Sequence, residues 1–290
     1  MVTPLTAGGE LDLPALERVI EHVLGGGIHA IFILGTTGEA TSLTQEVRRP
    51  LIQNTVRLVK SRVPVVVGGT DTVLAQGVSL AQFAADHGAD AIVVSTPYYV
   101  PPNQSELMAY VTAFVARQPL PIVLYNIPQL TKGAFAPETV RQLAQSPRVI
   151  GIKDSSGDLP YFESIRPVTD RADFAFLIGN EPLIAAGIER GAIGSIPSGA
   201  NLAPRLFVRL FEALTARPVD SVQSTALFER VKKLRAFYTQ RPGASGVIRA
   251  VKGGLACMGI CGTQVAAPYE QCSAGELEEM RRQLREHDLG

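Results

Sequence analysis

Several residue types are scarce in this sequence, and each scarcity excludes a class of protein. Among 290 residues there is no tryptophan, and there are only three cysteines and four histidines. An odd number of cysteines, placed late in the chain as Cys257, Cys261 and Cys272, is not a disulfide framework. The dispersed histidines do not supply the ligands of a zinc site. We therefore expect reduced thiols, no metal ion and no metal-dependent reaction.

Neither sign of charge is in excess, and long apolar runs are missing. The 27 basic and 27 acidic residues cancel to a formal net charge of zero, which gives no support to a nucleic-acid partner. No apolar run approaches the roughly 20 residues of a membrane span. The first residues also lack the basic and apolar segments of a signal peptide. These absences predict a cytoplasmic protein that acts on a small molecule, with neither nucleic acid nor membrane as a partner.

What the sequence does contain is a regular alternation of short apolar runs and helical patterns. Unbroken apolar runs are typical of strands buried on both faces, and their alternation with helices predicts a parallel sheet. Eight such units in a chain of this length favour an α/β fold of the closed (β/α)8 or TIM-barrel type over an open doubly wound sheet. No Gly-x-Gly-x-x-Gly follows any run, so a dinucleotide-binding fold gains no support. The expected strands cover residues 2–4, 30–34, 64–69, 91–95, 121–126, 149–155, 174–179 and 191–196.

The alternation stops near residue 215. Beyond it only helical patterns follow, and a capping box formed by Ser273 and Glu276 precedes the last, strongly charged one. A similar box, formed by Asn103 and Glu106, predicts the start of a helix within the alternating part. We therefore divide the chain into a catalytic barrel over residues 1–215 and an extension of three helices over residues 216–290.

Lys153 is the most unusual residue of the expected strands. The chain has only six lysines, and this one ends an otherwise apolar run, whereas the other five lie in loop-like or helix-like surroundings. Desolvation disfavours an ammonium ion, so a lysine in an apolar wall tends towards the neutral amine. A neutral amine is a nucleophile that forms a Schiff base with a ketone or aldehyde. The alternative is a strand-end lysine that reaches solvent or pairs with Asp154.

Other polar residues stand at or just after the ends of the expected strands. In barrels of this type the chemistry lies at the carboxyl-terminal rim. The residue types there suit a Schiff-base enzyme, because a tyrosine can move protons while hydroxyls and backbone amides hold a carboxylate. Each residue alone could equally be a turn, a helix cap or part of the core. The candidates are Thr36, Thr37, Tyr98, Tyr99, Tyr125, Asn126, Ser155, Gly179, Glu181 and Ser195.

Four motifs resemble those of the dihydrodipicolinate synthase and N-acetylneuraminate lyase family of pyruvate-dependent class I aldolases. They are residues 35–39 (Gly-Thr-Thr-Gly-Glu), 97–99 (Pro-Tyr-Tyr), 125–128 (Tyr-Asn-Ile-Pro) and 151–155 (Gly-Ile-Lys-Asp-Ser). Their order and spacing match the family, and the resemblance extends over nearly the whole chain. It implies that pyruvate or another 2-oxo acid forms an imine with the lysine of the last motif.

The resemblance also implies roles for the remaining motif residues. Tyr125 would relay protons and contact the substrate carboxylate, while Thr36 and Thr37 would bind that carboxylate and link the tyrosines into a proton relay. Tyr99 resembles a tyrosine that enters the site from a neighbouring subunit. The family is usually a homotetramer built as a dimer of dimers. No cofactor is implied, and the partners are pyruvate and an aldehyde, or a 2-oxo acid.

One departure from the family pattern bears on the substrate. Synthases carry an arginine that binds the carboxylate of aspartate semialdehyde, and Leu130 stands at its place, where it cannot make a bidentate contact. Lys132 is a possible substitute. Ser155, Glu181 and Ser195 offer polar groups to a polyol chain. We therefore favour a lyase that splits a 2-keto-3-deoxy sugar acid into pyruvate and an aldehyde.

Three alternatives stay open from the sequence. A dehydratase would start from the same imine and break a different bond. A synthase would condense pyruvate with aspartate semialdehyde to 4-hydroxy-tetrahydrodipicolinate. A barrel that only senses a small molecule would need no nucleophile, so the presence of Lys153 argues against it. Relatives carry further residues before residue 2, so we expect either an upstream start or a short first strand.

Overall fold

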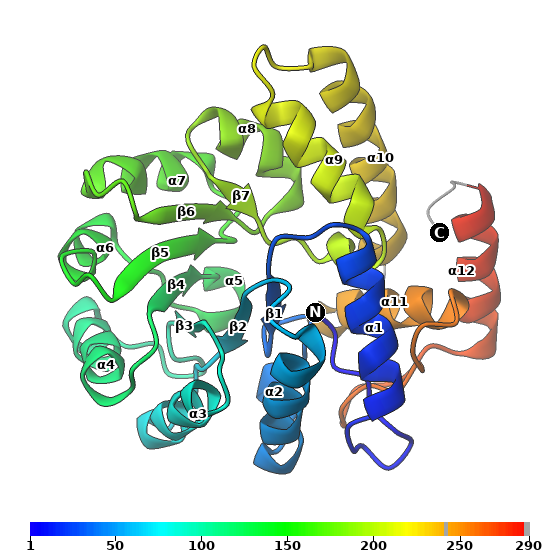
Figure 1. Ribbon diagram of the computed structural model, residues 1–290, viewed down its shortest axis with the longest axis horizontal. Helices are drawn as coiled ribbons and strands as arrows, with labels where there is room; N and C mark the ends of the chain where they lie inside the picture. The colour runs from blue at the N-terminus through cyan, green and yellow to red at the C-terminus, as the bar shows by residue number, and fades with distance from the viewer. Residues whose placement is uncertain (241–242, 287–290) are drawn as a thin grey trace. The chain divides into compact units, whose positions relative to one another are not determined.

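The computed structural model describes residues 1–240 and 243–286 (Figure 1). It is an α/β fold whose seven strands follow one another in chain order within the sheet. The strands are β1 (Ile31–Ile33), β2 (Val65–Gly68), β3 (Ala91–Ser95), β4 (Ile122–Asn126), β5 (Val149–Asp154), β6 (Ala175–Ile178) and β7 (Gly194–Ser195).

Helices alternate with the strands and then continue alone. The α-helices are α1 (Leu13–Gly25), α2 (Gln45–Val59), α3 (Leu74–Asp86), α4 (Gln104–Arg117), α5 (Pro128–Thr131), α6 (Pro137–Leu143), α7 (Leu159–Ile165), α8 (Ile184–Glu189), α9 (Pro204–Thr215), α10 (Ser221–Thr239), α11 (Ala244–Cys257) and α12 (Ala274–Glu286). The short 3-10 helices are η1 (Ala40–Ser42), η2 (Arg166–Val168), η3 (Glu181–Leu183) and η4 (Gly199–Asn201). The described residues form no helix that is both long and apolar enough to cross a membrane.

By contacts between residues the chain divides into two compact units. One unit combines Met1–Val65 with Ser198–Gly290, and the other is Val66–Pro197. The helices α10, α11 and α12 confirm the three helices predicted after residue 215. The proposed division into a barrel over 1–215 and an extension over 216–290 remains a prediction, because the extension shares its compact unit with the first 65 residues.

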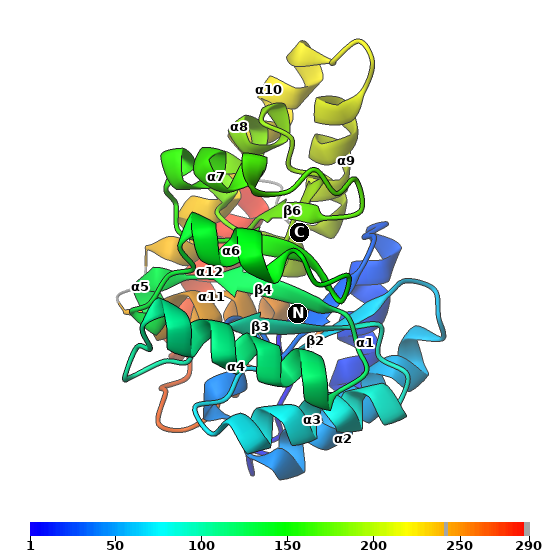
Figure 2. The same ribbon diagram turned by 90° about the vertical axis from the view of Figure 1, so that its left-hand side faces the viewer.

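The unit Val66–Pro197 carries most of the parallel sheet. Its strands β3 and β4 are buried at every position, as their unbroken apolar runs predict for strands covered on both faces. Helix α4 lies along β3 and β4 (Figure 2) and packs against α3 and α6. The predicted capping box of α4 is confirmed, since Asn103 and Glu106 bond to each other's backbone amides. Burial thus stabilises the strands, and the helix that covers them begins at a local capping signal.

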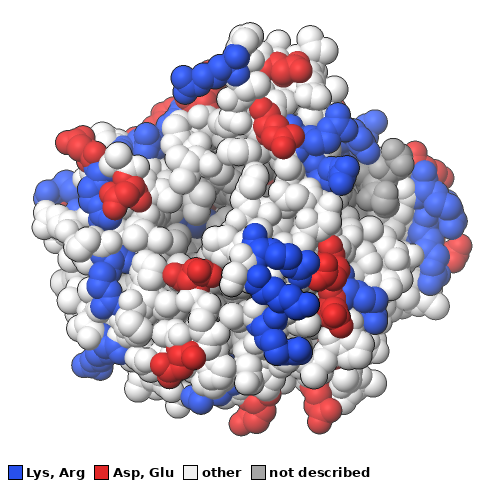
Figure 3. All heavy atoms as spheres, in the orientation of Figure 1, with Lys and Arg blue, Asp and Glu red and all other residues white. Residues whose placement is uncertain are grey.

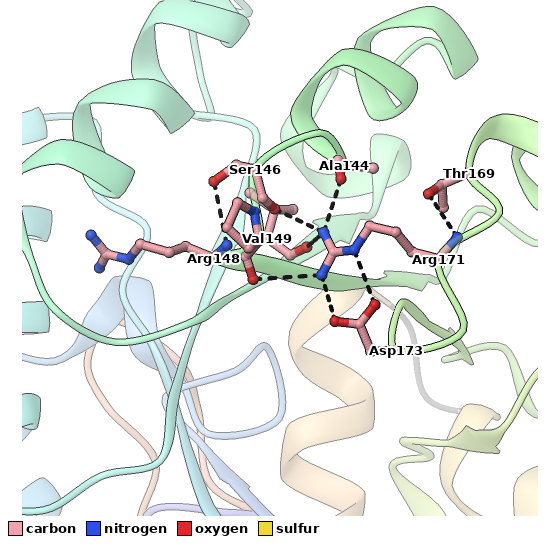
Figure 4. Close-up of polar contacts among 8 residues, drawn as sticks. Ala144, Ser146, Arg148, Val149, Thr169, Arg171 and Asp173 are labelled. Atoms are coloured by element: carbon pink, nitrogen blue, oxygen red, sulfur yellow. Dashed lines mark hydrogen bonds and ion pairs between the residues drawn. The ribbon is translucent and has the colours of Figure 1, made fainter.

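A single arginine fixes the turn that leads into β5 (Figure 4). The Arg171 Nη1 donates to the carbonyl oxygens of Ala144, Ser146 and Val149 at 2.9, 2.8 and 3.0 Å. The Asp173 carboxylate orients the same guanidinium by accepting from Nε at 3.0 Å and from Nη2 at 2.8 Å. The arginine therefore supplies a donor to three backbone carbonyl groups around this turn.

The other unit joins the first helices to the last ones. Asp12 caps α1 by accepting from Ala15 N at 3.0 Å, and the apolar face of α1, including Leu16 and Ile20, is buried. Helix α1 packs against α2 and α9, while α9 to α12 pack consecutively on one another. On the face in Figure 3 acidic and basic side chains are interspersed. Arg62 and Glu21 form an exposed ion pair in this unit.

The first predicted strand is not formed. Met1 N donates to Phe32 O at 2.5 Å, but Val2 N donates to the side chain of Asn201 at 2.9 Å. Pro4 has no N–H to donate. Residues 2–4 therefore lie beside β1 without a strand ladder, and the described residues contain seven strands instead of the eight predicted. The helix α5, which directly follows β4, was not expected from the sequence.

Candidate active site

Tyr125 and Lys153 face each other across two neighbouring parallel strands. They are register partners on β4 and β5, so both side chains lie on the same face of the sheet. Both are buried, with 7% of Tyr125 and 5% of Lys153 exposed. The lysine Nζ lies 4.1 Å from the centroid of the tyrosine ring. The structure thus places the predicted nucleophile directly beside the predicted proton carrier.

A buried polar network lies one register position further along the same strands. Asn126 is the register partner of Asp154, and its Nδ2 donates to Asp154 Oδ1 at 2.8 Å. The other carboxylate oxygen accepts from Ser156 Oγ at 2.8 Å. Burial raises the pKa of Asp154, while the hydrogen bonds from Asn126 and Ser156 act in the opposite direction. The network locks together the ends of β4 and β5.

This network was missed by sequence reasoning, which considered Asp154 only as a partner for Lys153. Adjacent strand residues point to opposite faces, so Asp154 turns towards Asn126 and Ser156 instead. Asn126 also accepts from Phe135 N at 3.1 Å through its Oδ1. The signal in the sequence was a polar residue directly after each of them, Asn126 after Tyr125 and Asp154 after Lys153.

Gly179 lies against the lysine stem. Its N–H donates to Asp154 O at 2.7 Å, which continues the ladder from β5 to β6. A Cβ at this position would lie 2.7 Å from Lys153 Cε and would overlap Ser155 Oγ. Only glycine therefore leaves both side chains in place. The predicted residues Tyr125, Lys153, Ser155 and Gly179 are brought together by the fold.

The remaining candidates in this unit are placed differently. Glu181 begins η3 and is buried, with 5% exposed, while Ser195 pairs with Ile178 at the end of β7. Tyr99 is 90% exposed and has a φ of 78°, a left-handed conformation that is costly for an aromatic residue. Its ring therefore lies in solvent in a single chain. The site roles of these three residues stay predictions.

Thr36 and Thr37 lie in the other compact unit, in the loop between β1 and η1. Thr36 is exposed, and its carbonyl accepts from Glu39 N at 3.0 Å. The hydroxyls of Thr37 and Ser198 lie 2.9 Å apart. The Gly38 carbonyl accepts from Thr3 Oγ1 at 2.7 Å. The loop is therefore held from several sides, and the carboxylate-binding role of the two threonines remains a prediction.

The segment after Tyr125 carries the departure from the synthase pattern. Leu130 lies on α5 and is 40% exposed. Lys132, the possible substitute for the missing arginine, donates from Nζ to Gln129 O at 3.1 Å. Gln129 in turn donates to the carbonyl of Ser156. The short helix is thus tied to the loop that follows β5, and the Lys132 ammonium folds back on its own helix.

The fold and the side-chain cluster define a class I aldolase-type enzyme, and comparison with known proteins gives its family. The model described as "Dihydrodipicolinate synthetase family" matches residues 1–287. The chain belongs to this family, as the motifs had indicated. Family membership also identifies it as a lyase of the class I aldolase type, which removes support from the non-catalytic sensor.

Relatives of known sequence and structure agree over almost the full length. The 4-hydroxy-tetrahydrodipicolinate synthase of Ruegeria pomeroyi is 35% identical over 268 residues, which cover 92% of this chain and 90% of the relative. Dihydrodipicolinate synthase from Bacteroides thetaiotaomicron is 40% identical with a TM-score of 0.94, covering 99% of this chain and 96% of that one. YagE from E. coli K12, in complex with pyruvate, is 27% identical with a TM-score of 0.92, covering 100% and 97%. These likenesses confirm the predicted TIM-barrel fold.

Proposed function

We propose that Lys153 forms an imine with pyruvate and that the enzyme condenses this imine with aspartate semialdehyde, as a 4-hydroxy-tetrahydrodipicolinate synthase. The observation that carries the imine step is the buried Lys153 amine beside the Tyr125 ring. The names of the curated relatives support the synthase reaction over the sugar-acid lyase favoured from the sequence. The lyase is retained as a second candidate.

The reaction begins at the ketone of pyruvate. The neutral Lys153 amine adds to the C2 carbonyl carbon, and the carbinolamine loses water to give a protonated imine. Loss of a proton from C3 yields an enamine, whose C3 attacks the aldehyde carbon and forms the new C–C bond. The amino group of the aspartate semialdehyde part then attacks the imine carbon, closes the ring and displaces the Lys153 amine, so that the one water released is the water lost from the carbinolamine. In this proposal Tyr125 moves protons between these steps, and the support for that role is that its ring lies against the lysine.

Gly179 and the two threonines have supporting roles in this proposal. Gly179 leaves room for the Lys153 stem. Thr36 and Thr37 offer hydroxyl groups to the pyruvate carboxylate, as the family motif implies. The Ser155 hydroxyl and the Lys153 stem both lie next to the place that a Cβ of Gly179 would occupy. Ser155 is therefore close enough to the lysine to meet the substrate.

Borohydride trapping tests the imine directly. The protein is incubated with pyruvate and reduced, and intact mass and peptide mapping locate the adduct. A pyruvyl adduct on Lys153 that is absent from Lys153→Ala supports the proposal. Protein that binds pyruvate without an adduct, or with one on another lysine, refutes it. Product analysis with pyruvate and aspartate semialdehyde then tests the synthase reaction. Formation of 4-hydroxy-tetrahydrodipicolinate supports it, and absence of turnover contradicts it.

Leu130 favours the second candidate, a lyase acting on 2-keto-3-deoxy sugar acids. An exposed leucine on α5 gives no charged contact to the carboxylate of aspartate semialdehyde. Wild type is therefore assayed for pyruvate release from a panel of these acids. We expect Leu130→Arg to lower the KM for aspartate semialdehyde, with Leu130→Gln as the neutral control. If wild type releases pyruvate from these acids, and Leu130→Arg does not lower the KM for aspartate semialdehyde, the lyase is favoured over the synthase.

We also propose that Tyr99 meets a second copy of the chain and that the enzyme is a dimer of dimers. Tyr99 and Val100 are 90% and 74% exposed, and Tyr99 is held in a left-handed conformation. Such strain persists when surrounding structure or function requires it. Sedimentation equilibrium gives the mass of wild type and of Tyr99→Ala. A monomeric wild type with full activity would overturn this assignment.

A further inference from the structure

An ion pair is buried beneath the loop that carries Thr36 and Thr37. It joins Glu39, the last residue of the Gly-Thr-Thr-Gly-Glu motif, to Lys252 in the middle of α11, and both side chains are fully buried. Burying two charges costs free energy that their attraction often fails to recover. Replacing a buried ion pair by well-packed apolar residues is often neutral or stabilising. The pair is therefore better explained by what it positions than by stability alone.

Both partners make a second bond to the segment that follows α11. Lys252 Nζ donates to Gln264 O at 2.5 Å, and Glu39 Oε2 accepts from Ala266 N at 2.7 Å. Burial lowers the pKa of Lys252, while the Glu39 charge acts in the opposite direction. The carboxylate and the ammonium thus bridge the loop, the helix and the segment after it, all within one compact unit.

The backbone of Glu39 is also constrained. Its φ of 60° is in the left-handed region, which is uncommon for a residue other than glycine. In this conformation its N–H donates to Thr36 O at 3.0 Å. Glu39 therefore constrains the loop in two ways. Its N–H bonds to Thr36 within the loop, and its carboxylate bonds to α11 and to the segment after it. A shift of the carboxylate would be transmitted to the peptide of Thr36 through a single residue.

We propose that Glu39 and Lys252 are positioning residues, which hold the Thr36–Thr37 loop in the geometry that binds the substrate carboxylate. Helix α11 of the C-terminal extension thereby sets the affinity for pyruvate without contacting it. This role rests on the proposed function, in which the two threonines bind the carboxylate of pyruvate. A purely structural ion pair would change stability and leave the affinity for pyruvate unaltered.

The experiment measures how adduct formation depends on pyruvate concentration. Glu39→Gln keeps the size of the side chain and its acceptor oxygen but removes the charge. The double variant Glu39→Gln with Lys252→Met removes both charges and leaves neither one buried alone. We expect both to raise the half-saturating pyruvate concentration for trapping, and the KM for pyruvate, on the order of 10- to 100-fold. The limiting kcat is expected to fall less.

The matched control lies on the same helix. Arg249, three residues before Lys252, pairs with Glu276 of α12 at 3.2 Å. Arg249→Met disturbs the packing of α11 without touching the threonine loop, so it should lower the melting temperature and leave the KM for pyruvate within twofold of wild type. This variant distinguishes the effect of disturbed α11 packing from the effect of a displaced Thr36–Thr37 loop.

The outcomes distinguish this inference from the proposed function. A wild type that traps no pyruvate at Lys153 refutes the proposed function and the positioning role with it. A wild type that traps pyruvate, with unchanged half-saturation in a folded Glu39→Gln or double variant, refutes the positioning role alone. Equal increases in KM for the Arg249→Met control and for Glu39→Gln would also overturn it, because the effect would then belong to the helix as a whole.

Discussion

Lys153 and Tyr125 occupy the same register position on neighbouring parallel strands, with the lysine Nζ 4.1 Å from the centre of the phenol ring. The two residues are far apart in the chain, and each is buried in a strand whose other side chains are largely apolar. The tyrosine ring supplies an apolar wall beside the amine, with a hydroxyl at its tip. The pair therefore brings together the proposed nucleophile and the proposed proton carrier.

Removing the Tyr125 hydroxyl should separate imine chemistry from proton transfer. In Tyr125→Phe the ring that packs on Lys153 is kept, so the folded protein should still be trapped with pyruvate. We expect kcat to fall on the order of 10²- to 10⁴-fold, the usual contribution of a positioned acid or base. Steady-state kinetics and the trapping rate are measured on the same preparation. A Tyr125→Phe enzyme with wild-type kcat would show that another group moves the protons.

Gly179 should tolerate no side chain. In Gly179→Ala the new Cβ would meet Lys153 Cε at 2.7 Å and overlap Ser155 Oγ, so the lysine must leave its position. We expect imine formation with pyruvate to be lost or greatly slowed. Gly194→Ala is the matched control in the next strand, since its Cβ would lie 3.6 Å from Leu177, an ordinary contact. Comparable activity in the two variants would contradict the steric argument.

The Arg171 side chain should contribute to stability through the carbonyl groups it serves. Arg171→Met leaves the carbonyls of Ala144, Ser146 and Val149 without this donor, at a cost of about 1–3 kcal/mol in the free energy of unfolding. Urea unfolding measures the change. Arg141→Met, which removes an exposed pair with Glu138, should leave stability essentially unchanged. Equal effects of the two substitutions would rule out the role assigned to Arg171.

The buried carboxyl of Asp154 should make stability depend on pH in a defined direction. Its pKa is raised above 3.8, first of all by burial, so the folded state holds the proton more tightly than the unfolded state. This contribution is fully present below pH 3.8 and is lost as the pH rises through the raised pKa. Asp154→Asn has no such proton, and its amide can still bond to Asn126 and Ser156.

The free energy of unfolding of Asp154→Asn, relative to wild type, should therefore increase from pH 4 towards neutral pH and then level off. Urea titrations of both proteins across this range provide the comparison. A difference that is constant with pH, or that decreases as the pH rises, would show that Asp154 is not the group responsible.

Local patterns predicted most of the secondary structure. The strand expected over 91–95 is β3 (Ala91–Ser95), and the capping box expected from Asn103 and Glu106 begins α4 (Gln104–Arg117). Both are set by neighbouring residues, through apolar periodicity and turn signals. The errors fall where the decisive partner is distant. The N–H of Val2 bonds to Asn201, and no local pattern predicts that a side chain 199 residues away replaces a strand ladder.

The sequence by itself determined the order of strands and helices, and it singled out Lys153 as a polar residue in an apolar strand. Those features follow from periodicity and from the cost of burying a charge, which act over a few residues. The tertiary structure alone decided that Tyr125 is the register partner of Lys153, that Asp154 bonds to Asn126, and that Glu39 pairs with Lys252. These pairings depend on how distant segments pack, because register and burial are fixed only when the chain folds back on itself.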